Sequence, residues 1–290
     1  MAPGARLPHA INPEQLSVIQ GSSLPMSPKA ASRPTGIVMD LDGTIFRGEQ
    51  LLPGAREACA RLGQHGHPIL FVTNAVGTSN SVAGFLNRLG LPASPEQVMT
   101  PVIVLKRYLA EHVPHATLYV IGEPPLLQEL AADFRLSEDP AEIDAVVASA
   151  DPTFDFHKLT IAFEALRRGA RFLATNTDPT WPMAGRVVPD AGAIIGALEG
   201  CTQRKVEAVT GKPSLLIARM ALDLLGREPE ETWIVGDSLV TDIAMGQQAG
   251  MKTVLVLTGV TSRADLAASA IEPDHVLEDL AGLPGLVGVA

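Results

Sequence analysis

Residues 36–44 read Gly-Ile-Val-Met-Asp-Leu-Asp-Gly-Thr, and this stretch decides the fold. The apolar run 36–41 predicts a short buried strand. Asp40 and Asp42 stand two positions apart, so in an extended chain their carboxylates point the same way. Gly43 permits a tight turn whose backbone N–H groups are free to meet an anion. The stretch therefore predicts a strand that ends in a pair of carboxylates.

Six further runs of mostly β-branched and aliphatic residues follow, bounded by Gly, Pro, Asn or Asp. Amphipathic stretches of helical period lie between them. This alternation predicts an α/β protein with a doubly wound parallel sheet, whose ligands bind beyond the carboxyl ends of the strands. The other expected strands are 68–73, 117–122, 144–149, 170–175, 232–236 and 252–258, and the expected helices are 54–65, 79–90, 124–135, 157–169, 213–226 and 241–250.

Polar residues follow several of these strands. Thr73 and Asn74 offer a hydroxyl and an amide that can hydrogen-bond phosphate oxygens. Asp237 ends a strand and Asp242 opens the next helix, and carboxylates are the ligands that Mg²⁺ prefers. Lys212 lies just before a helix, where it would be a point charge aimed at the same site.

The order of these motifs resembles that of the haloacid dehalogenase superfamily. The motifs are Asp-x-Asp-Gly-Thr at 40–44, Thr73-Asn74, Lys212, and Gly236-Asp237 followed by Asp242. The resemblance covers nearly all of residues 36–260. Four more segments resemble the class IIA phosphatases of this superfamily, the NagD-like or p-nitrophenylphosphatase branch. They are Phe-Arg-Gly at 46–48, Val-Ile-Gly-Glu at 120–123, Ala-Thr-Asn-Thr-Asp-Pro-Thr at 174–180 and Gly-Lys-Pro-Ser at 211–214.

The spacing of the motifs predicts a second domain. About 138 residues separate Asn74 from Lys212, and they carry strand and helix signals of their own. Together with the resemblance, this implies a Rossmann-like core at 35–100 and 207–290 with an α/β cap inserted at 101–206. Residues 1–34 hold six prolines and read as an arm, either poorly ordered or packed on a partner subunit, with a possible short helix beginning near Asn12.

The resemblance implies a role for each carboxylate. Asp40 would be the nucleophile that forms an aspartyl-phosphate. Asp42 would protonate the leaving alcohol and then deprotonate the hydrolytic water. Mg²⁺ would be held by the Asp40 and Asp237 carboxylates and the Asp42 backbone carbonyl, with Asp242 binding a metal-bound water or orienting a neighbour. Because alcohol leaving groups gain about 10²–10⁴-fold from a general acid, Asp42 favours a phosphatase over a dehalogenase.

The resemblance also names the residues that would bind the substrate. Thr73 and Lys212 would bind the transferring phosphoryl group, and backbone amides near Gly43 and Asn74 would contribute further hydrogen bonds to it. In the insert, Asn176 and Asp178 are candidates for substrate contact, although a plain turn is nearly as good an interpretation.

We therefore expect a Mg²⁺-dependent phosphatase of a small phosphorylated metabolite: a sugar phosphate, glycerol phosphate, phosphoglycolate, a nucleotide or pyridoxal phosphate. Two alternatives stay open, a phosphomutase with the same Asp pair and a non-catalytic protein that binds phosphorylated metabolites. With 22 Lys and Arg against 32 Asp and Glu, the net charge of −10 argues against a nucleic-acid partner. We expect no membrane partner, a cytoplasmic location and a homodimer through the cap.

Overall fold

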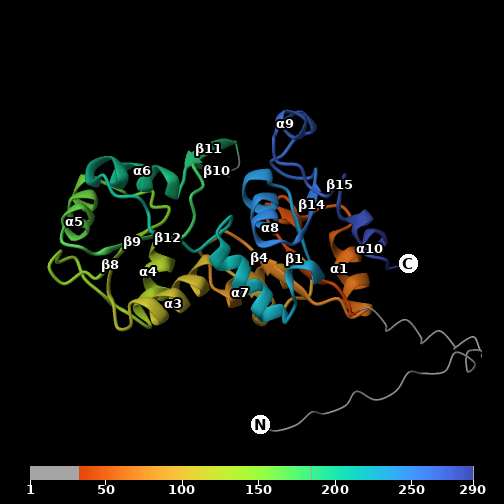
Figure 1. Ribbon diagram of the computed structural model, residues 1–290, viewed down its shortest axis with the longest axis horizontal. Coiled ribbons are helices and arrows are strands. Elements are labelled where there is room, and N and C mark those ends of the chain that lie inside the picture. Colours follow the sequence, from red (N-terminus) through yellow and green to blue (C-terminus); the bar gives the residue numbers. More distant parts are fainter. Residues whose placement is uncertain (1–32, 184, 290) are drawn as a thin grey trace, which may run out of the picture. The chain divides into compact units, whose positions relative to one another are not determined.

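Six parallel strands form the main sheet, in the order β15-β14-β13-β1-β4-β5. The structure is a computed structural model, and it describes residues 33–183 and 185–289 (Figure 1). The central strand β1 is buried along its whole length, with Ile37 and Met39 on one face of the sheet and Val38 on the other. The strands are β1 (Gly36–Met39), β4 (Ile69–Val72), β5 (Val98–Met99), β13 (Thr232–Gly236), β14 (Lys252–Val256) and β15 (His275–Leu277).

Helices cover both faces of the main sheet. One face packs against α1 (Ala55–Gln64), α2 (Ser79–Arg88) and α10 (Leu283–Leu286). The other packs against α7 (Leu215–Leu225) and α8 (Ala244–Ala249). Helix α7 begins where the Ser214 hydroxyl accepts from the Leu216 N–H and ends at Gly226, which adopts a left-handed conformation.

A second parallel sheet has the order β12-β9-β8-β6-β7. Its strands are β6 (Thr117–Ile121), β7 (Arg135–Leu136), β8 (Ala145–Ala148), β9 (Arg171–Ala174) and β12 (Ala208–Val209). Helices α5 (Phe156–Arg167) and α6 (Ala191–Thr202) pack on one face, and α3 (Pro101–His112) and α4 (Pro124–Ala131) on the other. Residues 117–209, which contain this sheet, are called the second module below.

Shorter elements complete the described part of the chain. Two antiparallel hairpins are β2 (Phe46–Arg47) with β3 (Gln50–Leu51), and β10 (Thr180–Met183) with β11 (Arg186–Pro189). Helix α9 spans Arg263–Ala268, and single turns lie at Pro95–Gln97, Pro229–Glu231, Leu239–Ile243 and Leu280–Gly282.

The structure confirms the predicted α/β fold with a doubly wound parallel sheet. Each expected strand coincides with an observed one, and the carboxyl ends of β1, β4 and β13 lie side by side, as their direct pairing with β1 requires. The expected arm and its short helix near Asn12 lie outside the described residues, apart from Arg33 and Pro34. No helix among the described residues is long and apolar enough to cross a bilayer.

Candidate active site

Asp40 lies at the carboxyl end of the central strand. Its backbone N–H donates to the Val235 carbonyl at 2.9 Å, so the sheet ladder fixes it. The residue is 6% exposed, and its Oδ2 accepts a hydrogen bond from the Thr44 hydroxyl at 3.3 Å. The turn that follows thus helps to orient the carboxylate that the strand presents.

Asp237 projects from the end of the neighbouring strand β13. Its Oδ2 accepts from the Val260 N–H at 2.6 Å, and the residue is 3% exposed. Two glycines make room for this carboxylate. A β-carbon at Gly43, which has φ +81°, would lie 2.4 Å from Asp237 Oδ2, and one at Gly259 would lie 1.7 Å from it. The backbone at both positions must therefore lack a side chain.

Asp242 is fully buried in the turn Leu239–Ile243 that follows β13. Its Oδ2 accepts from the Ser238 N–H at 3.1 Å. A β-carbon at Gly236 would lie 2.2 Å from Asp242 Cγ, so this glycine allows the carboxylate to fold back over the strand end.

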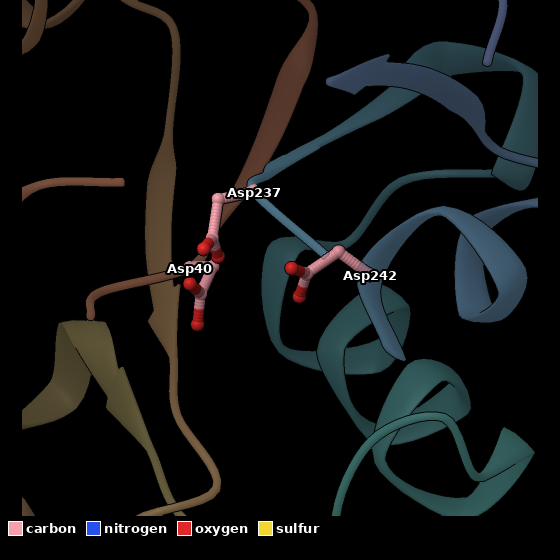
Figure 2. Close-up of side chains that lie close together, drawn as sticks. All are labelled: Asp40, Asp237 and Asp242. Carbon is pink, nitrogen blue, oxygen red and sulfur yellow. The ribbon is translucent and has the colours of Figure 1, made fainter. Parts of the chain in front are cut away.

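The three carboxylates form one cluster. One carboxylate oxygen each of Asp40, Asp237 and Asp242 lies within 4.8 Å of the others. Figure 2 shows Asp40 and Asp237 side by side from neighbouring strands, with Asp242 facing them from the other side. Three buried carboxylates are hard oxygen ligands, so the donor set fits a divalent cation such as Mg²⁺. The Asp42 carboxylate is not part of this group, and its predicted ligand atom is a backbone carbonyl.

Lys212 is the cation of the site. Its ammonium donates to Asp242 Oδ1 at 2.7 Å and to Asp40 Oδ1, and the residue is 4% exposed. Burial alone would lower the pKa of Lys212, but the Asp242 and Asp40 carboxylates raise it above its ordinary value. The side chain therefore carries a full positive charge at neutral pH.

Burial raises the pKa of all three clustered carboxyls to about 6. For Asp40, the Lys212 charge opposes this rise and the Asp237 charge adds to it. For Asp237, the Asp242 charge is the largest addition to burial. Carboxylates crowded in this way are stabilised by added positive charge.

Asp42 and Thr73 lie at the same edge of the sheet with different exposure. Asp42 is an exposed residue. Its pKa is nevertheless raised, because partial burial of the carboxyl outweighs the opposing effect of the Lys212 charge. A carboxyl with a raised pKa is suited to exchange protons with a bound molecule. Thr73 is buried, and its Oγ1 accepts from the Ala75 N–H at 3.0 Å, which leaves its O–H proton to donate. The backbone N–H of Gly43, which was predicted to bind phosphate, instead donates to the Phe46 carbonyl at 2.8 Å.

The two candidates in the second module lie in the loop after β9. Asn176 is buried, and its Oδ1 accepts from the Asp178 N–H at 3.0 Å, so it shapes the turn. Asp178 Oδ2 accepts from Asn74 Nδ2 at 2.9 Å. The structure thus brings Asp178 to the predicted phosphate-binding loop.

Several residues that hold the site together had no assigned role in the sequence prediction. They are Thr44, Gly259 and Val260, together with Thr258, whose hydroxyl donates to the Gly43 carbonyl at 2.7 Å. A signal for Gly259 was present, because it follows strand β14 at the same edge of the sheet as Asp40 and Asp237.

Comparisons with known proteins identify the family of this chain. A haloacid dehalogenase-like hydrolase family model matches residues 37–133, and a HAD-hydrolase-like model matches 209–283. The sugar-phosphatase AraL of Bacillus subtilis is 37% identical over 85% of this chain and 91% of its own. The 5'-nucleotidase YutF of the same organism is 35% identical over 84% and 95%.

Solved structures show the same fold over nearly their full length. The p-nitrophenyl phosphatase from Archaeoglobus fulgidus superposes with a TM-score of 0.82 at 32% identity, covering 87% of this chain and 99% of that one. NagD from E. coli K-12 gives 0.77 at 30% identity, covering 85% and 97%. The chain therefore belongs to the haloacid dehalogenase-like hydrolases and, within them, to the class IIA phosphatases, the NagD-like and p-nitrophenylphosphatase branch that its motifs predicted.

Proposed function

We propose that this phosphatase hydrolyses a small-molecule phosphate monoester with the help of Mg²⁺, through an aspartyl-phosphate on Asp40. The observation that carries the proposal is the Lys212 ammonium, which lies between Asp40 and Asp242 beside a third buried carboxylate, Asp237. A carboxylate can attack a phosphate dianion only where positive charge offsets their repulsion, and phosphoryl transfer depends mostly on such positioning and charge stabilisation.

The cation would be held by Asp40 and Asp237, the Asp42 backbone carbonyl and, directly or through water, Asp242. Bound there, Mg²⁺ would neutralise the negative charge of the phosphate oxygens. Its binding would also keep the carboxyls ionised, although burial raises the pKa of each to about 6.

The chemistry takes two steps at the protein's own groups. In the first, an Asp40 oxygen attacks phosphorus, the bond to the ester oxygen breaks, and Asp42 gives its proton to the leaving alcohol. In the second, Asp42 removes a proton from water, which attacks phosphorus and releases inorganic phosphate and the free Asp40 carboxylate. Lys212 and the Thr73 hydroxyl would hold the phosphoryl oxygens through both steps.

We further propose that the predicted insert 101–206 serves as a cap that excludes water and selects the leaving group. The direct hydrogen bond from Asn74 to Asp178 supports this role, since it joins the second module to the loop that would bind phosphate. The sheet of that module extends slightly past the predicted insert, to Val209 in β12, because β12 pairs with β9.

The names of the relatives support a substrate class. Those named as a sugar-phosphatase, acid sugar phosphatases and a 5'-nucleotidase favour sugar phosphates and nucleoside monophosphates, within a wider set that includes glycerol phosphate, phosphoglycolate and pyridoxal phosphate. A homodimer through the cap and a cytoplasmic location stay predictions.

The experiment is a panel of these esters together with p-nitrophenyl phosphate, assayed for inorganic phosphate with Mg²⁺ and with a chelator. We expect Mg²⁺-dependent release from p-nitrophenyl phosphate and from at least one sugar phosphate or nucleotide. Phosphorus NMR distinguishes the alternatives. Formation of an isomerised ester without free phosphate would show that the enzyme is a mutase and not a phosphatase. Absence of turnover of every ester would contradict the proposal.

A further inference from the structure

The side chain of Asn74 makes three hydrogen bonds to other protein groups. Its Nδ2 donates to the Lys212 carbonyl at 3.1 Å and to Asp178 Oδ2 at 2.9 Å, and its Oδ1 accepts from the Lys212 N–H at 2.7 Å. An amide nitrogen has two protons to donate. Both are used, so this side chain holds other residues in place and has no N–H left for a phosphate.

Two of the three bonds fix the backbone of Lys212. The ammonium at the end of the Lys212 side chain donates to Asp40 and Asp242. Because a lysine side chain is long and flexible, the place of its charge depends on where its backbone is anchored. Gly211 makes this anchoring possible, since a β-carbon there would lie 2.5 Å from Asn74 Oδ1.

The third bond is donated to Asp178 in the second module. Asp178 is held there at both of its backbone groups: its N–H donates to Asn176 Oδ1 at 3.0 Å, and its carbonyl accepts from the Gly192 N–H at the start of α6 at 3.0 Å. A β-carbon at Gly192 would lie 2.9 Å from that carbonyl. The position of the Asp178 carboxylate is therefore determined by its own module.

We propose that Asn74 is a positioning residue through which Asp178 of the second module sets the place of Lys212. This inference rests on the proposed function only in taking Lys212 as the cation of phosphoryl transfer. When Asp178 occupies its observed place, Asn74 is held on both sides and presents the lysine to Asp40. When Asp178 moves away, Asn74 and the Lys212 backbone lose that constraint.

A pair of substitutions separates this role from simple loss of contact. In Asn74→Asp both donors are lost and two carboxylates face each other, so we expect kcat for p-nitrophenyl phosphate to fall by about 10²-fold, with a smaller change in KM, because a displaced charge acts mainly on the transition state. Asp178→Asn keeps an oxygen acceptor, and we expect less than about a fivefold loss.

The double variant Asn74→Asp/Asp178→Asn exchanges the two groups. The amide of the new residue 178 can then donate to the new carboxylate at 74, whose second oxygen can still accept from the Lys212 N–H. The bond to the Lys212 carbonyl stays lost in the double variant, so we expect kcat to recover only partly, to within about tenfold of the parent. A double variant that is no better than Asn74→Asp would overturn the coupling.

Asn87, an exposed residue of α2, provides a control with a similar set of hydrogen bonds. Its Nδ2 donates to the Ala83 and Ala93 carbonyls and its Oδ1 accepts from the Ala93 N–H, which is the same three-bond pattern away from the site. Asn87→Asp is expected to lower Tm and leave kcat unchanged. If it lowers kcat as much as Asn74→Asp does, the effect at Asn74 is only structural.

A measurement without substrate tests the inference apart from catalysis. Hydrogen exchange of the segment 211–216 should accelerate in Asp178→Ala as well as in Asn74→Ala, because either change frees the Lys212 backbone. Acceleration in Asn74→Ala alone would show that Asp178 has no hold on Lys212 and would overturn the inference. If the parent protein released no phosphate but exchange accelerated in both variants, the proposed function would fail while the coupling stood.

Discussion

The Lys212 ammonium donates a 2.7 Å hydrogen bond to Asp242 in an environment where both side chains are almost fully enclosed. A second carboxylate, Asp40, accepts from the same ammonium. One buried cation thus pairs with two buried anions. The third carboxylate, Asp237, forms no salt bridge with any described residue, and the positive charge that lowers its pKa is that of the more distant Lys212. This excess of negative charge is the electrostatic reason to expect a divalent ion.

Removing the charge of Lys212 tests its role in transfer. We expect Lys212→Met to lower kcat/KM for p-nitrophenyl phosphate by about 10²–10³-fold, because one stabiliser of the transferring phosphoryl group is lost. Lys205→Met is the control, since this lysine is 85% exposed and pairs only with Glu199 among the described residues. Equal activity of Lys212→Met and Lys205→Met would contradict the assignment.

Two esters with different leaving groups test whether Asp42 is the general acid. In Asp42→Asn we expect kcat/KM to fall by about 10²–10⁴-fold for glycerol phosphate and by much less for p-nitrophenyl phosphate, whose leaving group departs without a proton. The comparison uses kcat/KM because that constant reports the steps up to departure of the leaving group. The same fractional loss for both esters would mean that Asp42 is not the general acid.

The carboxylate cluster predicts a pH-dependent response of stability to Mg²⁺. Burial raises the pKa of Asp40, Asp237 and Asp242 from 3.8 to about 6, so the folded metal-free protein keeps protons that the unfolded chain has already released. Their contribution to stability is present below about pH 4 and is lost as pH rises through about 6. A bound cation offsets that loss by binding the ionised carboxylates.

We therefore expect Mg²⁺ to raise Tm clearly at pH 8 and little at pH 5, measured by thermal unfolding with Mg²⁺ and with a chelator. Asp237→Asn, which removes one carboxylate, should lose most of the shift at pH 8. A shift of equal size at both pH values would be inconsistent with binding at this cluster.

A pair of glycines tests the packing around Asp242. In Gly236→Ala the new methyl would lie 2.2 Å from Asp242 Cγ, and we expect a loss of about 1–3 kcal/mol in the free energy of unfolding together with reduced activity. Gly196 lies within α6, and no atom outside its chain neighbours and the nearby helix backbone lies within 4 Å of an added β-carbon. Gly196→Ala should instead stabilise the protein by about 0.5–1 kcal/mol. Urea unfolding of both variants compares them, and a neutral Gly236→Ala would refute the close contact.

The sequence predicted the parts of this molecule that depend on local pattern. Buried strands such as β1 and β13 are short apolar runs, and parallel pairing brings their carboxyl ends together, so Asp40 and Asp237 could be placed near each other from sequence. Helix α3 was not predicted because it buries apolar residues in two different cores, Val104 in one and Leu105 in the other, and so lacks a plain polar face.

Contacts between distant segments could not be predicted. The bond from Asn74 to Asp178 spans 104 positions and depends on how two sheets meet, which neither local sequence specifies. The two-residue strands β5, β7 and β12 are too short to carry a periodic pattern and exist because a longer neighbour pairs with them.

The most direct test of the central claim is phosphate release by Asp40→Asn. The substitution keeps the size of the side chain and one of its two acceptor oxygens but removes the nucleophilic carboxylate. With p-nitrophenyl phosphate and Mg²⁺, and with folding verified by circular dichroism, we predict turnover by the parent and a loss of about 10³-fold or more in the variant. Full turnover by Asp40→Asn would contradict an aspartyl-phosphate at this residue.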